Sequence, residues 1–411
     1  DKSEANKYFP GRSLTIWVAL DDVDEKNGCL WFVPGSHRKK LRQHRTASAS
    51  SHVLTTDDME EVYAGKAHPV PLEKGDAVFW TGRTLHYANG NFTNMLRRTY
   101  ILNFRPQKAI EFERKNGYDH LKNGFKNFDD MIPEIYKPCL SYHHKNAAAI
   151  PLMAYNIPIN EISEAVDQGY FFMKIKIGQP GTQEVMLEKD KMRLSAIHKA
   201  IGNVRTKYSE NGKLPYYFDA NGRYEKKETL MRLLDYAKKI GAFDQISVIE
   251  EPFNESLEID VSDIPVRLAA DESAHTDEDA IKRIEMGYKA IALKAIAKTL
   301  SMTMKIAQVA HERNIPCFCA DLTVNPILIE WNKNVAARLK SFPGMNNLGL
   351  LESNGHQNYK NWKEMISYHP QKNGSWVKAK NGVYPLGNDF YKNSGGIFER
   401  SPHYENMFLK K

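Results

Sequence analysis

The sequence predicts an α/β protein with a (β/α) barrel in its C-terminal two-thirds, preceded by a partial all-β domain of the sandwich or jelly-roll kind. From about residue 150, short apolar segments alternate with amphipathic segments eight times, which is typical of a parallel barrel. Before about residue 110, short apolar or alternating runs are separated by turn residues, and no long helical pattern interrupts them. An all-β part therefore precedes an α/β part.

The composition excludes several classes of protein. With 411 residues, of which 42% are hydrophobic and 26% charged, the chain has material for two or three soluble domains. The net charge of +7 comes mostly from scattered basic residues, so no nucleic-acid partner is expected. There is no signal peptide, no apolar run of about 18 residues and no disulfide framework among the four cysteines. We therefore expect a cytoplasmic protein without a membrane partner, and a homo-oligomer stays open.

Turn residues mark the ends of the predicted strands in the N-terminal part. Asn27-Gly28 and Asn89-Gly90 are dipeptides that favour tight turns. The absence of a long helical pattern favours a jelly roll or sandwich. The predicted strands are residues 14–20, 29–33, 77–80 and 98–104.

In the C-terminal part, short apolar strands are separated by segments with the 3.6-residue period of helices, as at Leu230, Leu233 and Leu234. A doubly wound open sheet is the structural alternative. It needs a Gly-rich phosphate loop after the first strand, and residues 155–158 do not form one. The predicted strands are residues 151–155, 171–177, 216–219, 246–250, 266–271, 290–294, 316–320 and 348–351. The predicted helices include residues 184–201, 227–240, 277–286, 302–313 and 327–339.

Charged residues stand at the ends of five consecutive predicted strands. In parallel barrels the reacting groups lie at the C-terminal ends of the strands. Residues two apart on a strand share a face, so Lys174 and Lys176 are both expected to point into the barrel mouth. The six charged residues at these ends are Lys174, Lys176, Asp219, Glu250, Asp271 and Lys294.

Three of these residues are carboxylates on adjacent strands. Hard oxygen ligands suit Mg²⁺, with Mn²⁺ as the alternative, rather than Zn²⁺, so Asp219, Glu250 and Asp271 are predicted to bind Mg²⁺. A divalent cation beside a substrate carboxylate stabilises the charge that forms when the α-proton leaves, and a lysine near it with a lowered pKa can act as the base. The alternative is a set of ordinary salt bridges, but six charged groups at one end of a barrel are costly to desolvate without a ligand.

The motifs at the strand ends resemble the enolase superfamily, and within it the muconate-lactonizing-enzyme-like branch of the mandelate racemase/muconate lactonizing enzyme family. The resemblance covers about residues 125–400 and rests on the Lys-x-Lys, Asp-x-Asn, Glu-Glu-Pro and Ala-Asp-Glu-Ser motifs. Lys294 indicates the branch, since the mandelate-racemase-like branch has a His–Asp pair there. The resemblance implies an enolase-type (β/α) barrel over residues 125–356.

The resemblance also implies an activity and the roles of the residues. The activity is removal of the proton α to the carboxylate of a small substrate, by an isomerase or lyase acting as an epimerase, racemase, cycloisomerase or dehydratase. Lys176 and Lys294 would be the acid and the base on opposite faces of the substrate, and Lys174 would contact the substrate carboxylate. Mg²⁺ would bind to Asp219, Glu250 and Asp271.

Substrate specificity is expected at the mouths of the seventh and eighth strands. The superfamily binds the distal part of the substrate there, and the candidate residues are Asp321, Glu352 and Asn354. For Asp321 and Glu352, a structural hydrogen bond is the alternative. Superfamily members also carry an N-terminal capping domain, most of which has no counterpart in this sequence. Residues 357–411 are predicted to hold its remnant.

Residues 1–124 resemble the phytanoyl-CoA dioxygenase group of Fe(II)/2-oxoglutarate oxygenases. The resemblance rests on a stretch from residue 17 to the Pro-Gly-Ser-His sequence at 34–37, then on Gly75-Asp76, His86 and Arg97. It implies a double-stranded β-helix, which is a jelly roll. It also implies that His86 is the distal Fe²⁺ ligand and that Arg97 pairs with 2-oxoglutarate, with Arg98 as the rival for that role.

The same resemblance makes Asp1 the Asp of the family's His-x-Asp iron motif. Counting back from His86 by the usual spacing reaches Asp1, and the chain begins there without an initiator Met. We therefore expect a fragment that lacks the first His ligand, so an intact iron site is not expected. Fe(II)/2-oxoglutarate-dependent oxygenase activity of this segment is the alternative function.

Overall fold

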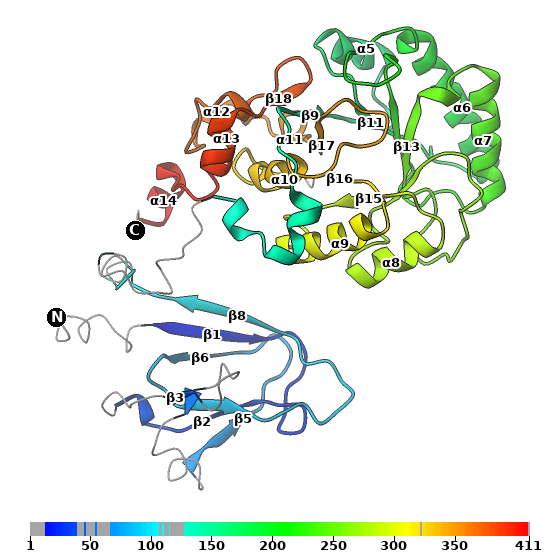
Figure 1. The fold of residues 1–411 in the computed structure, drawn as a ribbon. Helices are drawn as coiled ribbons and strands as arrows, with labels where there is room; N and C mark the ends of the chain where they lie inside the picture. The colour runs from blue at the N-terminus through cyan, green and yellow to red at the C-terminus, as the bar shows by residue number, and fades with distance from the viewer. Residues whose placement is uncertain are drawn as a thin grey trace. The chain divides into compact units, whose positions relative to one another are not determined.

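The computed structural model describes residues 13–38, 45–46, 54–55, 66–106, 109–110, 115, 127–320 and 323–409. The chain divides into two compact units, Asp1–Gly124 and Phe125–Lys411. In Figure 1 the first unit is drawn as blue and cyan strands, and the second as strands and helices that run mainly from green to red.

The described residues of the N-terminal unit form two three-stranded antiparallel sheets and one short strand pair. Its strands are β1 (Leu14–Ala19), β2 (Leu30–Phe32), β3 (Arg45–Thr46), β4 (Leu54–Thr55), β5 (His68–Val70), β6 (Ala77–Thr81), β7 (His86–Ala88) and β8 (Thr99–Phe104), with the 3₁₀ helix η1 (Ser36–Arg38). The sheet orders are β6-β1-β8 and β5-β2-β7. Trp17 and Trp80 of the first sheet and Leu30 of the second are buried in one cluster. The predicted jelly-roll type is confirmed.

The C-terminal unit is a closed barrel of parallel strands. Its strands are β9 (Asn146–Ile150), β10 (Leu152–Met153), β11 (Met173–Lys176), β12 (Tyr216–Asp219), β13 (Ile246–Glu250), β14 (Leu268–Ala270), β15 (Ala290–Leu293), β16 (Cys317–Cys319) and β17 (Gly349–Glu352). The first barrel strand is interrupted at Pro151. Its second half, β10, pairs with β11, and its first half, β9, pairs with β17, which closes the ring. The predicted (β/α) barrel is confirmed.

The first barrel strand begins earlier than the sequence predicted. We expected residues 151–155, whereas β9 starts at Asn146. Ala147, Ala148 and Ala149 are buried in this strand. Alanine has a low β propensity and an all-apolar run shows no alternation, so the pattern gave no strand. Packing between two neighbouring strands overrides that weak local preference.

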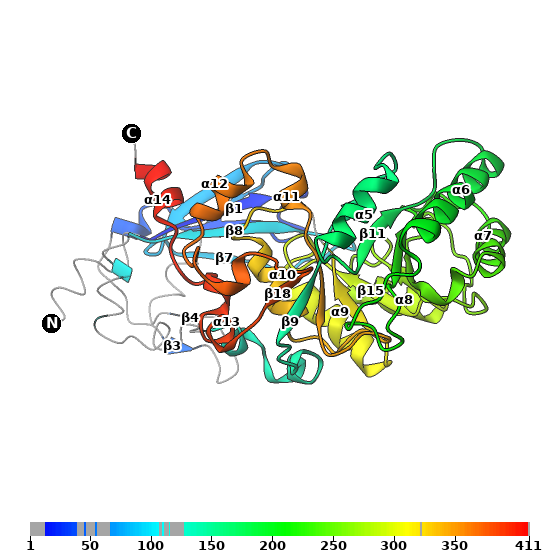
Figure 2. The same ribbon diagram turned by 90° about the horizontal axis from the view of Figure 1, so that it is seen from above.

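Helices follow most of the barrel strands and cover the outside of the ring. They are α5 (Ile159–Asp167), α6 (Gln183–Ile201), α7 (Lys227–Lys239), α8 (Asp277–Glu285), α9 (Leu300–Glu312) and α10 (Ile329–Ala336), with the 3₁₀ helices η2 (Asp129–Met131), η3 (Glu134–Leu140) and η4 (Phe243–Gln245). In both ribbon views α6 and α7 lie outside the strands (Figures 1 and 2). In the described part of the chain, no helix is both long and apolar enough to cross a membrane.

The connection from β13 to β14 departs from the predicted eight strand–helix alternations. The described residues 251–267 form no regular helix. Instead, side-chain oxygens of Asn254 and Asp260 accept backbone N–H groups of Ser256 and Ser262, at 3.0 and 2.9 Å. Such local hydrogen bonds compete with helix formation.

The C-terminal segment packs against the barrel within the same unit. Its elements are α11 (Gly355–Asn358), α12 (Trp362–Ser367), η5 (Ser375–Val377), β18 (Val383–Pro385), α13 (Asn388–Asn393), η6 (Ser394–Gly396) and α14 (Pro402–Leu409). β18 pairs antiparallel with β9. The buried Lys333 of α10 donates to Glu330 Oε1 at 2.7 Å and to the Trp376 carbonyl at 2.8 Å. The assignment of residues 357–411 as a remnant of a capping domain stays a prediction.

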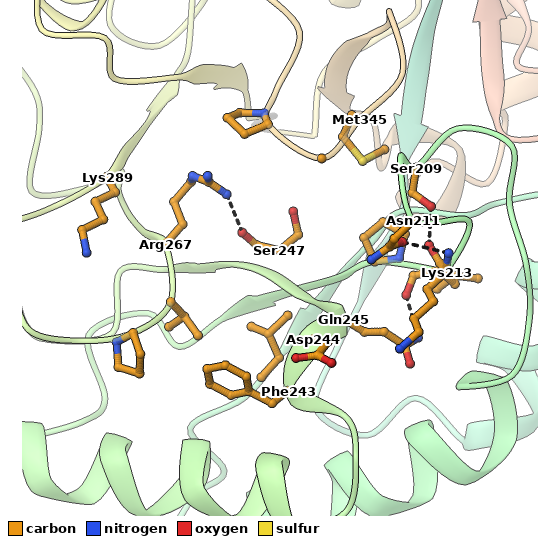
Figure 3. Close-up of a pocket in the computed structure, with 17 residues that line it drawn as sticks. Ser209, Asn211, Lys213, Phe243, Asp244, Gln245, Ser247, Arg267, Lys289 and Met345 are labelled. Carbon is orange, nitrogen blue, oxygen red and sulfur yellow. Dashed lines mark hydrogen bonds between the residues drawn. The ribbon is translucent and has the colours of Figure 1, made fainter.

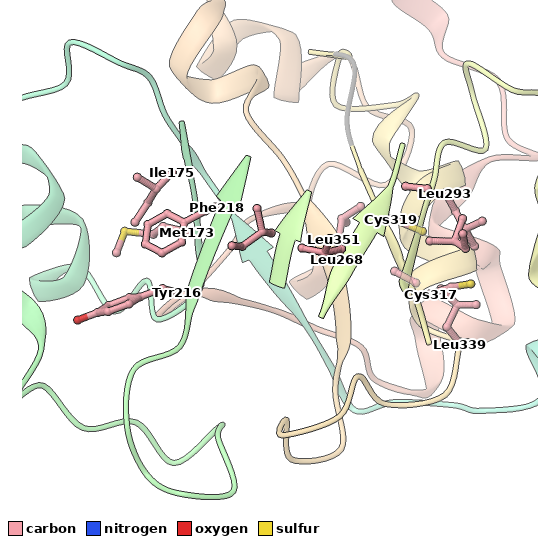
Figure 4. Packing of buried hydrophobic residues seen from close by; sticks show 14 of the residues in the cluster. Met173, Ile175, Tyr216, Phe218, Leu268, Leu293, Cys317, Cys319, Leu339 and Leu351 are labelled. Carbon is pink, nitrogen blue, oxygen red and sulfur yellow. The ribbon is translucent and has the colours of Figure 1, made fainter. Parts of the chain in front are cut away.

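Two hydrophobic clusters divide the barrel residues by strand alternation. Met173 and Ile175 of β11, and Phe218 of β12, lie in the outer cluster between strands and helices (Figure 4). Tyr217 lies in the inner cluster, which fills the barrel. Because side chains alternate across a strand, Lys174, Lys176 and Asp219 take the inward direction. The hydrophobic core thus orients the charged residues toward the barrel axis.

Gly349 allows β17 to approach α10 closely, since a Cβ there would lie 2.2 Å from the Ala336 carbonyl oxygen. We expect Gly349→Ala to lower the free energy of unfolding by about 1–3 kcal/mol, the usual cost of overpacking, in urea denaturation. Gly387→Ala is the control, because nothing lies within 4 Å of its Cβ position. An equal loss in both variants would contradict this explanation.

Candidate active site

The charged residues predicted from the sequence meet at the carboxyl end of the barrel. β11 to β15 are consecutive neighbours in the sheet. In the strand register, Lys176 stands beside Asp219, and Asp219 stands beside Glu250. Asp271 and Lys294 directly follow β14 and β15. Three acidic strand ends are therefore flanked on either side by a strand end that carries lysine.

Lys174 lies at the centre of the cluster. Its Nζ is 2.9 Å from Asp219 Oδ2, 2.8 Å from Glu250 Oε1 and 3.2 Å from Glu352 Oε2, and its side chain is 6% exposed. Burial lowers the pKa of this amine, but the charges of Glu250, Glu352 and Asp219 outweigh burial and raise the pKa well above its ordinary value. Lys174 is therefore held as an ammonium that neutralises part of the acidic cluster.

Lys176, at the end of β11, lies on one flank of the cluster and stands beside Asp219 of β12. Its Nζ donates to Asp219 Oδ2 at 2.5 Å and also to Asn221 Oδ1. Asp219 in turn accepts the Asn221 backbone N–H at 2.9 Å. Burial alone would raise the pKa of Asp219, but Lys174 and Lys176 outweigh it and lower that pKa. Asp219 is thus an ionised carboxylate with several donors around it.

Lys294 lies on the opposite flank, where it donates to Asp271 Oδ2. Burial lowers the pKa of Lys294, but the charge and hydrogen bond of Asp271, with Glu250 and Glu272, outweigh burial and raise it. These acidic neighbours keep the proton on Lys294 Nζ, and the lowered lysine pKa expected beside a bound cation stays a prediction. A second amine, Lys298, donates to the backbone carbonyls of Asp271 and Ala274 at 2.8 and 2.9 Å.

Glu250, Asp271 and Glu272 could hold a metal ion. One oxygen from each carboxylate lies within 4.8 Å of the others, and the set is the one group of this kind among the described residues. Glu272 Oε2 is buried and has no hydrogen-bond partner in the described chain. Oxygen donors of this type fit a hard divalent cation such as Mg²⁺. Asp219 belongs to the predicted triad but not to this group.

The charge balance of the cluster also fits a cation. Among the described residues, the carboxylates of Asp219, Glu250, Asp271, Glu272 and Glu352 surround four lysine amines, those of Lys174, Lys176, Lys294 and Lys298. Burial, with the charges of Asp271 and Glu352, raises the pKa of Glu250 even though Lys174 opposes this. The raised pKa of Glu250 reflects this burial and repulsion, and a bound cation would relieve the repulsion and favour the ionised form of Glu250.

The structure describes two of the three predicted specificity residues, Glu352 and Asn354. Glu352 ends β17 and reaches Lys174, and Asn354 Nδ2 donates to Glu352 Oε1 at 3.3 Å. Glu352 thus belongs to the central cluster rather than to its rim, with Asn354 beside it. Asp321 lies outside the described residues.

Sequence comparison identifies the barrel. The sequence model of the family described as "Enolase C-terminal domain-like" matches residues 159–376, more than half of the chain. The chain belongs to this family. The resemblance predicted from the strand-end motifs is therefore confirmed.

Solved structures similar to this enolase-family chain include two bacterial enzymes. N-succinyl Arg/Lys racemase from Bacillus cereus is 16% identical, with a TM-score of 0.44, covering 55% of this chain and 57% of its own. A dipeptide epimerase from Enterococcus faecalis, solved with Mg and a dipeptide, is 19% identical and has a TM-score of 0.47. The match covers 61% of this chain and 64% of the epimerase chain.

Residues 3–99 match the phytanoyl-CoA dioxygenase family, which confirms the second resemblance. Phytanoyl-CoA dioxygenase domain-containing protein 1 from Danio rerio is 36% identical over 109 residues, 26% of this chain and 38% of the relative. The Mus musculus protein of that name is 32% identical over 95 residues, 22% of this chain and 33% of the relative. The chain thus spans less than two-fifths of these relatives.

In this N-terminal unit, His86 and Arg97 both lie against buried tryptophans. The His86 ring centroid is 4.7 Å from that of Trp80, and Arg97 lies 5.8 Å from the Trp17 ring centroid. Arg98 instead pairs with Asp21 through two hydrogen bonds of 3.0 and 2.7 Å, and this lowers the pKa of Asp21 to about 2. Arg98 is therefore paired with a carboxylate, whereas the guanidinium of Arg97 lies over the Trp17 ring.

An iron site is not built by the described residues of this unit. His86 belongs to no group of three potential metal ligands there. Asp1, the predicted carboxylate ligand, lies outside the described residues. The iron and 2-oxoglutarate roles of Asp1, His86 and Arg97 stay predictions.

The sequence interpretation missed several groups of the enolase-family site. Tyr217 donates to Glu250 Oε2, and its position two residues before Asp219 could have placed it on the inward face. Glu251 accepts the Asp271 N–H at 2.7 Å, and burial raises the pKa of Glu251 to about 7. Glu272 and Lys298 carried no spacing signal, because both lie in irregular segments after strands.

Removing Lys174 should destabilise the barrel strongly. We expect Lys174→Met to lower the free energy of unfolding by about 3–5 kcal/mol, because three buried carboxylates lose a shared cation. Urea denaturation followed by tryptophan fluorescence measures the loss. Lys305→Met, at an exposed position of α9, is the control and should change stability by less than about 0.5 kcal/mol. Equal stability of both variants would contradict the central role of Lys174.

Proposed function

We propose that the barrel is a Mg²⁺-dependent enzyme that removes the proton α to the carboxylate of a small substrate, as an epimerase or racemase, or as a cycloisomerase or dehydratase. One observation carries the proposal. Lys176 ends β11 and Lys294 directly follows β15, while Asp219 and Glu250 end β12 and β13 and Asp271 directly follows β14. A substrate carboxylate held at the acidic strand ends would place its α-carbon between Lys176 and Lys294.

We assign the metal to Asp219, Glu250 and Asp271, with Glu272 as the alternative third ligand. Glu250 and Asp271 belong to both sets. Asp219 is the preferred third member because it stands beside Glu250 in the strand register and is fully buried. A bound Mg²⁺ would supply positive charge beside the substrate carboxylate, which stabilises the negative charge that develops when the α-proton leaves.

The protein's own groups would move the proton. We assign the acid role to Lys294, whose Nζ donates to Asp271 on the flank opposite Lys176. Lys176, on the other flank, would accept the α-proton. Lys174 would hold the acidic cluster together and meet the substrate carboxylate. Asp321, Glu352 and Asn354 would shape the part of the site that meets the rest of the substrate.

The N-terminal unit carries no part of this proposal. Of the three iron ligands expected by resemblance to the phytanoyl-CoA dioxygenase family, the described residues include His86 alone. No oxygenase step is therefore assigned to it.

Mg²⁺ should raise the melting temperature of the full chain. A cation at a hundred times its Kd adds about 2.7 kcal/mol of stability, and Glu250→Gln or Asp271→Asn should abolish the rise. Glu278→Gln, at an exposed position of α8, should keep it. Asp219→Asn should weaken the effect more than Glu272→Gln does; the reverse order would move the third ligand to Glu272. No Mg²⁺-dependent rise in the unmodified protein would remove the metal assignment.

Exchange of substrate α-protons with D₂O tests the lysines. N-acylated amino acids and dipeptides form a first panel, since the two bacterial enzymes above are named for such substrates. Lys176→Ala should slow exchange by about 10²–10⁴-fold, the usual contribution of an acid–base group. Lys294→Ala should keep exchange but lose product, because only protonation of the opposite face is removed.

Lys305→Ala, at an exposed position on α9, is the matched control and should keep both exchange and product formation. Unchanged exchange in Lys176→Ala would contradict the assigned base. Absence of exchange with every compound of the panel in the unmodified protein would contradict the choice of substrate class.

A further inference from the structure

A cavity of about 390 Å³ opens at the amino-terminal end of the barrel strands. Its lining includes Pro215, Gln245, Arg267 and Lys289, each directly before the first residue of β12, β13, β14 or β15 (Figure 3). The candidate active site lies at the opposite ends of the same strands. Buried side chains of the inner cluster, among them Tyr217, fill the barrel between the two ends. The cavity is therefore separate from the carboxylate cluster.

The charged side chains that line the cavity are mainly cationic. They are Lys213, Arg267 and Lys289, with Asp244 as the one acidic residue of the lining. Arg267 is half-buried, donates to the Ser247 carbonyl at 3.3 Å and lies over the Phe342 ring at 5.2 Å. In the described part of the chain no carboxylate pairs with it. Burying a guanidinium without a counter-charge is costly, and an anion in the cavity would offset that cost.

Most of the other lining residues are apolar, apart from the polar Ser209, Asn211, Gln245 and Ser247. The prolines Pro215, Pro265 and Pro343 come from three separate segments of the chain, and Phe243 and Val266 also line the cavity. Proline fixes the backbone φ angle, so these positions lose little freedom when a ligand binds. The volume lies in the range of small-molecule sites, about 300–1,000 Å³. An apolar wall next to cations suits an organic anion better than a hydrated inorganic ion.

We propose that this cavity binds a small organic anion through a carboxylate or phosphate group. The planar guanidinium of Arg267 would bind two oxygens of that group, because its paired N–H donors match this geometry. Lys213 and Lys289 would add positive charge at the entrance, and the prolines and Phe243 would contact the carbon skeleton. The site is independent of the proposed proton transfer at the other end of the barrel.

Isothermal titration of the full chain tests the proposal, with citrate and inorganic phosphate as separate probes. The titrations are done at constant ionic strength and without Mg²⁺. We expect saturable binding of at least one probe with a Kd below about 1 mM, within the ordinary range of affinities for small ligands. Tighter binding of citrate would indicate a carboxylate ligand, and tighter binding of phosphate a phosphorylated one.

Variants locate the binding. Arg267→Gln should weaken it at least tenfold. Lys289→Glu, at an exposed position, should also weaken it severalfold and does not disturb the half-buried Arg267. Lys305→Gln, on α9, is the control and should bind as the unmodified protein does. Absence of saturable binding, or binding unchanged by Arg267→Gln and Lys289→Glu, would overturn the proposal. So would binding that Lys294→Gln abolishes while Arg267→Gln retains it.

Discussion

The ammonium of Lys174 is the charge on which the candidate active site depends. It lies within 3.2 Å of Asp219, Glu250 and Glu352, and none of these three side chains is more than 3% exposed. Carboxylates buried this closely repel one another unless a cation lies among them. Lys174 points inward from β11, next to β12, while closure of the ring brings Glu352 of β17 to the same amine. The charged cluster and the closed barrel therefore require each other.

Two further buried carboxylates hold the backbone around this cluster. Asp190 of α6 accepts the N–H groups of Gly178 and Gln179, at 2.8 and 3.2 Å, directly after the strand that carries Lys176. Glu251 accepts the N–H of Asp271 at 2.7 Å. Neither carboxylate pairs with an amine of the cluster. Their contribution is to fix the chain at two strand ends, so that the charged side chains start from defined positions.

Strand alternation explains how far the sequence could predict this molecule. Apolar runs located β12 and β13 at their observed bounds, and the period of two put Lys174 and Lys176 on one face. It could not find β9, whose buried alanines lack alternation. It also could not show that Asp219 bonds to lysines while Glu272 joins Glu250 and Asp271, because rotamers and loop paths decide those contacts. Residue type and spacing therefore predict which groups gather, but not how they pair.

The two ends of the barrel gather different charged groups, because different chain segments meet the strands at each end. At the carboxyl end, carboxylates outnumber the lysine amines around Lys174, which favours a cation. At the amino end, Arg267, Lys213 and Lys289 line a cavity with Asp244 as its one acidic residue, which favours an anion. The packed interior between them, including Phe318 and Phe342, keeps the two sets of charges from neutralising each other. A barrel built this way can hold a cation at one end and an anion at the other, without either ligand requiring a change in the strands.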